Sequence, residues 1–163
     1  MASGDTLLIF TPLNNEPPAT IYATLDLRNN HPVLDFDDGT FEDAVFTGIL
    51  PRAYSGGGLT VSVFFAMSSA TAGDVWWKAS IERIGEVLDI DADGYSVYQV
   101  QKETVSGTCG IPVKAEIIFT DGAQMDSLVA GEPFRIRIRR DGTDWQDTAS
   151  GDAELLAVEI KET

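Results

Sequence analysis

The chain has 163 residues, of which 44% are hydrophobic, and it carries 26 acidic against 11 basic residues, a net charge of −15. This length and composition are typical of one globular domain and exclude a wholly disordered chain. The acidic excess repels phosphate backbones, so we expect no nucleic-acid partner. No apolar run approaches the roughly 20 residues of a membrane span, so we expect no membrane partner either.

The N-terminal stretch predicts an arm in place of a core strand. It lacks a cationic region, and the apolar run Leu7–Phe10 is too short for a signal peptide, so we expect synthesis and use without export. Three prolines follow before residue 19, and proline cannot donate to a strand ladder. We therefore expect residues 1–18 to form an N-terminal arm and residues 19–163 to form a single β-sandwich domain.

Alternation of apolar and polar residues then recurs from Ile21 to Ile160 and predicts a series of half-buried strands. Asn29–Pro32 is a turn, since asparagine tolerates positive φ. The one expected helical turn is Ala123–Val129. The strands are expected at Ile21–Arg28, Val33–Phe36, Ala44–Leu50, Leu59–Met67, Val75–Ile84, Tyr95–Lys102, Ile111–Thr120, Phe134–Arg139 and Leu156–Ile160. This pattern predicts an all-β fold: an antiparallel, jelly-roll-like β-sandwich of eight to nine strands.

Two strand pairings are expected. Leu59–Met67 and Val75–Ile84 are joined by a short loop of small residues, which favours an antiparallel pair. The arginines of Arg135–Arg139 alternate with apolar residues and are expected to meet Glu154 and Glu159 of the closing strand. Each such cross-strand pair contributes roughly 0.2–1 kcal/mol.

No catalytic or cofactor motif occurs in the sequence. Cys109 is the only cysteine, which excludes an intrachain disulfide, and His31 is the only histidine and lies in a turn beside no apparent nucleophile. Asp89–Gly94 matches the opening of a calcium loop, D-x-D-x-D-G, but Val100 stands at the twelfth position, where a bidentate glutamate is needed. We read this segment as an acidic turn and expect no enzyme activity, no metal and no cofactor.

Aromatic residues are the candidates for a contact surface. Trp76 and Trp77 are adjacent on one expected strand, so they point to opposite faces and one of them faces outward. With Tyr95, Tyr98 and Trp145 they could form a stacking platform for a sugar, but a protein contact is favoured. The residues expected at an interface are Leu7, Leu8, Ile9, Phe10, Tyr54, Trp76, Trp77 and Trp145.

Four segments of the chain resemble a group of small virion structural proteins from tailed phages and environmental viral sequence. These segments are Asn30–Phe36, Leu50–Leu59, Phe134–Asp141 and Gly151–Ile160. Their motifs consist of turns, glycines and strand faces, so no chemistry comes with them. The resemblance implies a jelly-roll-like virion protein associated with either the head or the tail.

The same resemblance implies a non-enzymatic capsid decoration, or cement, protein that attaches to the particle through several weak contacts. Its implied partners are itself, as a homo-oligomer and in particular a homotrimer, and the phage major capsid protein. Its implied location is the virion, after synthesis in the host cytoplasm. The alternative is a carbohydrate-binding β-sandwich module or a tail-associated receptor-binding protein, which an outward aromatic platform in a groove would favour.

Overall fold

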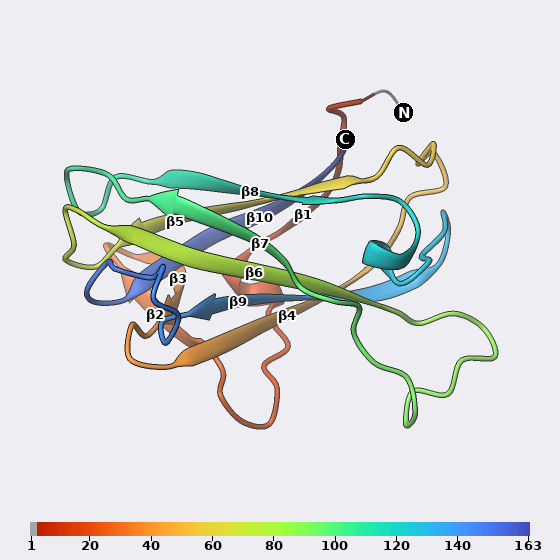
Figure 1. The fold of residues 1–163 in the computed structure, drawn as a ribbon, viewed down its shortest axis with the longest axis horizontal. Helices are drawn as coiled ribbons and strands as arrows, with labels where there is room; N and C mark the ends of the chain where they lie inside the picture. The colour runs from red at the N-terminus through yellow and green to blue at the C-terminus, as the bar shows by residue number, and fades with distance from the viewer. Residues whose placement is uncertain (1–2) are drawn as a thin grey trace.

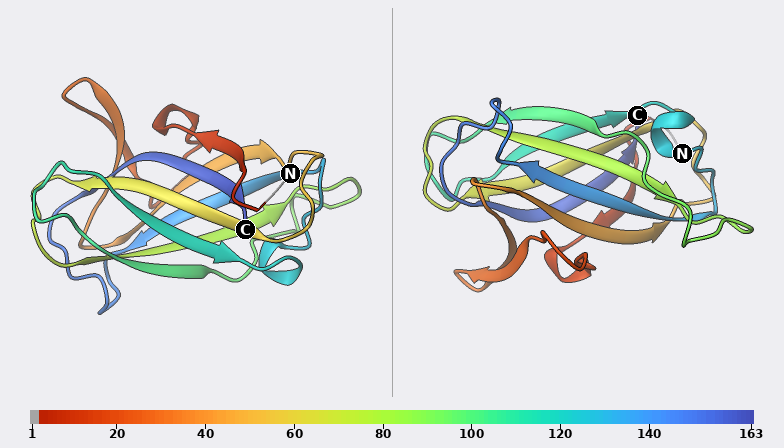
Figure 2. Two further views of the ribbon diagram at one scale, coloured as in Figure 1. Left: turned by 90° about the horizontal axis from the view of Figure 1, so that it is seen from above. Right: turned by 60° about the horizontal axis from the view of Figure 1, so that its bottom comes forward.

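The computed structural model describes residues 3–163, which form a sandwich of two antiparallel β-sheets (Figures 1 and 2). The predicted all-β fold is confirmed, with ten strands instead of eight to nine. The strands are β1 (Thr6–Phe10), β2 (Thr24–Arg28), β3 (His31–Phe36), β4 (Phe41–Ile49), β5 (Leu59–Met67), β6 (Asp74–Arg83), β7 (Gln99–Thr104), β8 (Val113–Phe119), β9 (Pro133–Asp141) and β10 (Ala153–Glu162).

The helical content of the described residues is two single 3₁₀ turns, η1 (Pro12–Asn14) and η2 (Ala123–Met125). The second turn lies inside the segment where the sequence predicts one. Among residues 3–163 there is no helix long and apolar enough to cross a membrane.

The strand order is that of a jelly roll. Sheet A runs β2-β3-β10-β5-β8, with β1 also beside β10, and sheet B runs β4-β9-β6-β7. The antiparallel pairs β3/β10, β4/β9, β5/β8 and β6/β7 nest inside one another along the chain. The chain from β3 to β10 therefore folds back as one long antiparallel ribbon, which is rolled into two facing sheets.

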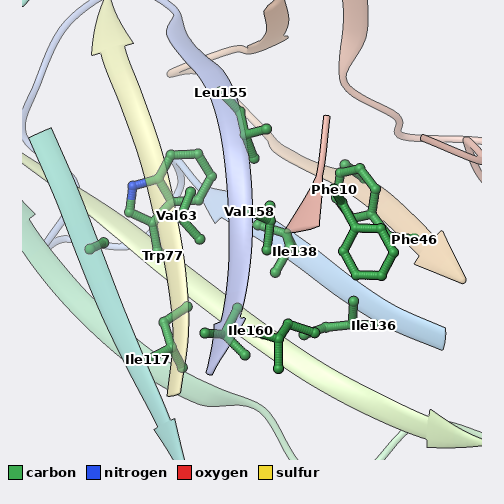
Figure 3. Packing of buried hydrophobic residues seen from close by; sticks show 14 of the residues in the cluster. Phe10, Phe46, Val63, Trp77, Ile117, Ile136, Ile138, Leu155, Val158 and Ile160 are labelled. Carbon is green, nitrogen blue, oxygen red and sulfur yellow. The ribbon is translucent and has the colours of Figure 1, made fainter. Parts of the chain in front are cut away.

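The core lies between the inner faces of the sheets, where alternate residues of each strand meet (Figure 3). Trp77 is completely buried there and makes edge contacts with Phe36 and Phe65, at centroid distances of 5.1 and 5.2 Å. Trp76 is on the opposite face of β6, as the alternation predicts. Other large side chains from both sheets are fully buried in the same core, among them Phe46, Phe119, Phe134, Leu34, Leu59, Ile81 and Ile117.

The segment expected to be a free arm contains a strand of sheet A. β1 pairs with the C-terminal half of β10, from Thr6 opposite Lys161 to Phe10 opposite Val158. Phe10 is 6% exposed and stacks on Phe46 at 5.3 Å. The apolar run thus finds its partner within its own domain, since the C-terminal half of β10 offers a free edge. The division into an arm of residues 1–18 and a domain of residues 19–163 stays a prediction, which deletion tests.

Both expected strand pairings are wrong. β5 lies in sheet A between β10 and β8, whereas β6 lies in sheet B between β9 and β7, so their short connection crosses between the sheets. The arginine strand β9 lies in sheet B, opposite β10. Arg135 is therefore paired with Glu82, and Arg139 with Asp43, in place of Glu154 and Glu159.

Candidate functional site

An open groove of about 470 Å³ lies on the outer face of sheet A. Its floor consists of Val33, Ala66 and Leu156 from β3, β5 and β10. These residues alternate with inward-facing neighbours and would be exposed on a bare sheet. Val33 and Ala66 are nevertheless buried, at 1% and 4% exposure, because loops rise on both sides of them.

The walls of the groove come from two loops far apart in the sequence. One wall is the β2–β3 turn, which contributes Arg28, Asn29 and His31. The other is the segment from Cys109 to Pro112, which precedes β8. Asn29 and Asn30 have φ of 47° and 65°, the left-handed values that a two-residue hairpin turn of this kind requires. The polar side chains of this wall are therefore presented by a tight turn.

An ion pair ties the first wall to the floor. The Arg28 guanidinium donates to Glu154 of β10 at 2.7 Å, and the same nitrogen donates to the Met67 carbonyl at 2.8 Å. The Gly110 amide donates to that carbonyl as well, at 3.1 Å, so both walls are tied to the same atom of β5. The hydrogen bond to Glu154 raises the pKa of Arg28 above its ordinary value.

A second carboxyl group lies beside this ion pair. Asp35 of β3 is directly opposite Glu154 in the ladder, and its Oδ1 is buried without a hydrogen-bond partner among the described residues. Burial, followed by repulsion from Glu154, Asp152 and Asp26, raises the pKa of Asp35 to about 6. Asp35 does not line the groove, but it lies next to Glu154, which does.

The groove continues into two further hollows. One of about 380 Å³ shares His31 and Leu156 with it and is bounded by Leu13 of η1. The next, of about 250 Å³, shares Leu13 and extends to Tyr22 and Leu25. The first of these hollows lies beside β10 between two pairings: β3 pairs with β10 up to Leu155, and β1 pairs with β10 from Val158 onward. The result is an elongated depression with an apolar floor.

The outer face of sheet B carries a different arrangement, in which arginines and aromatic rings alternate. Arg139 lies between Phe41 and Tyr98, with its guanidinium carbon 4.2 and 5.1 Å from the ring centroids. Arg137 lies between Tyr98 and Tyr95, at 4.6 and 4.2 Å. Arg135 follows beyond Tyr95, at 5.5 Å. We call this row, Phe41, Arg139, Tyr98, Arg137, Tyr95 and Arg135, the arginine–aromatic ladder.

The ladder covers the face with a filled, half-buried layer. Desolvation raises the pKa of Tyr98 to about 12, despite the neighbouring arginines, and raises that of Tyr95 as well. Cation–π contacts of this kind contribute roughly 0.5–2 kcal/mol each. Sequence alternation shows the arginines of β9 on one face but gives no sign that Tyr95 and Tyr98, from the loop before β7, lie over them.

The residues expected at an interface are dispersed. Trp77, Tyr54 and Phe10 are buried, at 0%, 8% and 6% exposure, whereas Trp145 and Ile9 are exposed, at 84% and 65%. Leu7, Leu8 and Trp76 are half-buried. Tyr54 is held at its hydroxyl by Asp121, at 3.1 Å, and by the Gly58 amide, at 2.9 Å. None of these residues lines the groove, and whether any of them forms an interface stays a prediction.

The groove residues carry no recognisable sequence signal, apart from Asn29 and His31, which the sequence places in a turn. Arg28 and Glu154 are 126 positions apart, so neither a motif nor a period links them. The acidic segment Asp89–Gly94 forms a turn in which the Asp89 carboxylate accepts from the Asp91 amide at 3.0 Å. Within residues 3–163, no group of three His, Cys, Asp or Glu side chains is placed to hold a metal ion.

Two solved structures have a similar overall arrangement. One is the CBM36-1 domain of a multidomain xylanase from the hindgut metagenome of Trinervitermes trinervoides, with 10% identity, 96% of this chain and 97% of that chain covered, and a TM-score of 0.48. The other is the xylan-binding module CBM15, with 9% identity, the same coverages and a TM-score of 0.49. No protein-family model and no curated protein sequence matches the chain.

These similarities correct the resemblance to virion structural proteins of tailed phages. The structures that this chain resembles are carbohydrate-binding modules, which contradicts the expected identification as a virion protein and as a capsid decoration protein. The short turn and strand motifs behind that expectation describe a jelly roll in general, and many unrelated proteins share that fold. None of these findings tests the expected phage capsid partner, the expected homo-oligomer or the expected virion location.

Proposed function

We propose that this protein is a non-catalytic carbohydrate-binding module that holds a glycan in the groove on the outer face of sheet A. The observation that carries the proposal is the composition of that groove. Its floor of Val33, Ala66 and Leu156 is apolar, and its wall presents the planar polar side chains of Arg28, Asn29 and His31. Ligand sites typically combine an apolar lining with a few polar groups that fix orientation.

A sugar ring matches this combination. Its C–H faces are apolar, whereas its rim is a belt of hydroxyl groups that both donate and accept hydrogen bonds. Asn29 offers an amide that can do both, and His31 offers an imidazole with a donor and an acceptor when neutral. The volume of about 470 Å³ is within the range of small-molecule sites.

The elongated shape supports a chain of sugars as the ligand. Beyond His31 and Leu156 the groove continues into the hollow bounded by Leu13, so a ligand in the first part has room to extend. A polymer binds such a site more tightly than a single sugar does, because each further sugar contributes contact area without a second loss of translational freedom.

The ion pair at the base of the groove supports binding in place of catalysis. Glu154 is engaged by Arg28 at 2.7 Å, and the side chain of Glu154 is 11% exposed. A carboxylate that is held in this way anchors the wall and is not free to serve as an acid or a base toward a glycosidic bond. We accordingly expect that the protein releases no reducing ends from a glycan that it binds.

The proposal is tested by affinity electrophoresis of the full chain in gels that contain soluble neutral polysaccharides, followed by calorimetry with the oligosaccharides of the best one. The double variant Asn29→Gly/His31→Ala should lose at least about tenfold in affinity, since two polar contacts are removed. Glycine at position 29 keeps the left-handed φ of 47°, so the turn is preserved.

Asn30→Gly is the matched control. Asn30 lies in the same turn with a φ of 65° but outside the groove lining, so this variant should bind as the wild type does. Trp145→Ala tests the other carbohydrate candidate, the exposed aromatic residue. If Trp145→Ala abolishes binding and Asn29→Gly/His31→Ala does not, the groove is not the site. If no polysaccharide retards the protein, the proposed function is wrong.

A further inference from the structure

Arg137 is unusual among the arginines of this protein. Arg28, Arg83, Arg135, Arg139 and Arg140 each have a carboxylate oxygen within 2.5–2.7 Å. No carboxylate of residues 3–163 lies within 4.0 Å of the Arg137 guanidinium, although the side chain is only half exposed. Arg52 also lacks such a partner, but it is exposed to water.

The strand register explains why Arg137 is unpaired. Its neighbours across the ladder are Val45 on β4 and Ser80 on β6, and neither carries a charge. Two residues away on either side, Arg139 lies opposite Asp43 and Arg135 lies opposite Glu82. Each of those carboxylates is already held at two nitrogens of its own arginine.

The aromatic rings hold Arg137 in one place without using its donors. Tyr95 and Tyr98 lie on either side of the guanidinium carbon, at 4.2 and 4.6 Å, and the Nε donates to the Ser80 hydroxyl at 3.2 Å. Stacking contacts occupy the faces of a guanidinium and leave the N–H groups at its edge, which form the fork that binds carboxylates.

We propose that Arg137 forms a second ligand site, on the outer face of sheet B, that binds the carboxylate of a uronic acid residue in a glycan. The proposal rests on the proposed carbohydrate binding and adds a ligand class and a second face to it. The Arg137 fork binds the carboxylate.

The flanking charges select a single, isolated carboxylate. Asp43 and Glu82 lie one strand repeat above and below Arg137, at a spacing of two residues, about 7 Å. An acidic peptide in extended conformation would place its next carboxylates at the same spacing, where Arg135 and Arg139 are already paired with Glu82 and Asp43 and offer no free guanidinium. A neutral glycan that carries one uronic acid residue places sugar hydroxyls there, which need no counter-charge. The net charge of −15 disfavours polyanions further.

The experiment compares three ligands that differ only at one carbon. They are a neutral hexose trisaccharide, the same trisaccharide oxidised at one C6 to a uronate, and the methyl ester of that uronate. The full chain is titrated with each at matched ionic strength, with calorimetry for the Kd and the Nε–Hε NMR signal of Arg137 as the site-specific readout. The uronate should bind at least about tenfold more tightly than the other two and should shift the Arg137 signal.

Variants assign that gain to the site. Arg137→Gln should reduce the affinity for the uronate to that for the methyl ester, and Arg137→Lys should recover only part of the loss, because a lysine lacks the planar fork. Arg52→Gln, which removes the same charge from an exposed position, should leave all three affinities unchanged. Thermal melts of each variant separate a binding effect from a loss of the ladder.

The outcomes are distinct from those of the groove experiment. The inference is wrong if the uronate binds no more tightly than its methyl ester, if it does not bind, or if Arg137→Gln retains the difference. It is also wrong if a pentaglutamate peptide binds at Arg137 more tightly than the uronate, since the partner would then be a protein. Binding of the neutral trisaccharide that depends on Asn29 and His31 would support the proposed function in each of these cases.

Discussion

Arg140 is completely buried in the sandwich, and its Nε and Nη2 donate to the two carboxylate oxygens of Asp147, at 2.9 and 2.7 Å. The remaining donors reach the carbonyls of Phe36, Gly151 and Ala149, at 3.0, 2.7 and 2.6 Å. All five N–H groups of the guanidinium are therefore satisfied. This one residue of β9 connects the loop between β9 and β10 to the end of β3, and β3 and β10 both contribute to the groove floor.

The first prediction concerns this pair. Asp147→Ala should lower the free energy of unfolding by about 3–5 kcal/mol, because it leaves a buried guanidinium without its counter-charge. Equilibrium unfolding in urea measures the change. Glu116→Ala, which removes a surface carboxylate paired with Lys114 at 2.8 Å, is the matched control and should cost at most about 1 kcal/mol. Equal effects of the two changes would contradict this account.

The second prediction concerns β1. Phe10→Ala should destabilise the protein by about 3–5 kcal/mol, since it removes a buried ring that stacks on Phe46. Ile9→Ala, at the neighbouring exposed position, should change the stability by less than about 0.5 kcal/mol. The same urea titrations compare the two. A tolerated Phe10→Ala would show that β1 contributes little to the core.

Deletion of residues 1–18 tests the same segment as a whole. The deletion also removes Asn15 and Glu16, which hydrogen-bond to the backbone of Val45 at the free edge of β4. We now expect the shortened chain to be strongly destabilised, in contrast to the sequence-based expectation that it folds. A shortened chain with a native circular dichroism spectrum and a cooperative melt would support the arm after all.

The third prediction is a pH dependence from Asp35. Its pKa is about 6 in the folded protein, above the ordinary value of 3.8, so the folded state binds the proton more tightly than the unfolded state does. The contribution to stability is complete below about pH 4 and is lost as the pH rises through 6. Asp35→Asn should therefore stabilise the protein at pH 7.5 relative to the wild type and flatten the curve between pH 4 and 6.

Glu116 provides the opposite control for that experiment. Hydrogen bonds from Lys114 and Lys161 lower its pKa from 4.5 to about 2, so its contribution is present above about pH 4.5 and is lost as the pH falls from there through 2. Burial also raises the pKa values of Glu42, Glu103 and Asp152, so Asp35 is isolated by comparing urea midpoints of the wild type and Asp35→Asn at pH 4, 5, 6 and 7.5. If Asp35→Asn leaves the slope between pH 4 and 6 unchanged, this carboxyl does not titrate as its surroundings indicate.

The fourth prediction separates the three tryptophans. Trp77→Ala should cost about 3–5 kcal/mol, since Trp77 is fully buried between Phe36 and Phe65. Trp145→Ala should change the stability by less than about 0.5 kcal/mol, because Trp145 is 84% exposed. Trp145→Phe should also remove most of the fluorescence that iodide quenches. Iodide quenching that persists in Trp145→Phe would mean that Trp76 is more accessible than the structure shows.

The sequence determined the class of fold. Alternation with period two states which side chains of a strand share a face, so the strands Leu59–Met67, Val75–Ile84 and Phe134–Arg139 and the opposite orientations of Trp76 and Trp77 follow from local pattern alone. The expected strand Tyr95–Lys102 is displaced, since β7 begins only at Gln99. The turn at Asn29–Asn30 follows from the same local chemistry, because asparagine tolerates the left-handed backbone. A long antiparallel β-sandwich is what such a pattern allows.

Only the tertiary structure decided which strands are neighbours. Alternation shows which face of a strand is buried but does not show which strand lies beside it. The sequence therefore predicts a β5–β6 hairpin and a pairing of the β9 arginines with β10, whereas the structure places β5 and β10 in one sheet and β6 and β9 in the other. The groove depends on that placement, since Arg28, Ala66, Gly110 and Glu154 meet only through pairings across most of the chain. Arg137 lacks a carboxylate for the same reason: its neighbours are set by the register of β4 and β6, which local sequence does not encode.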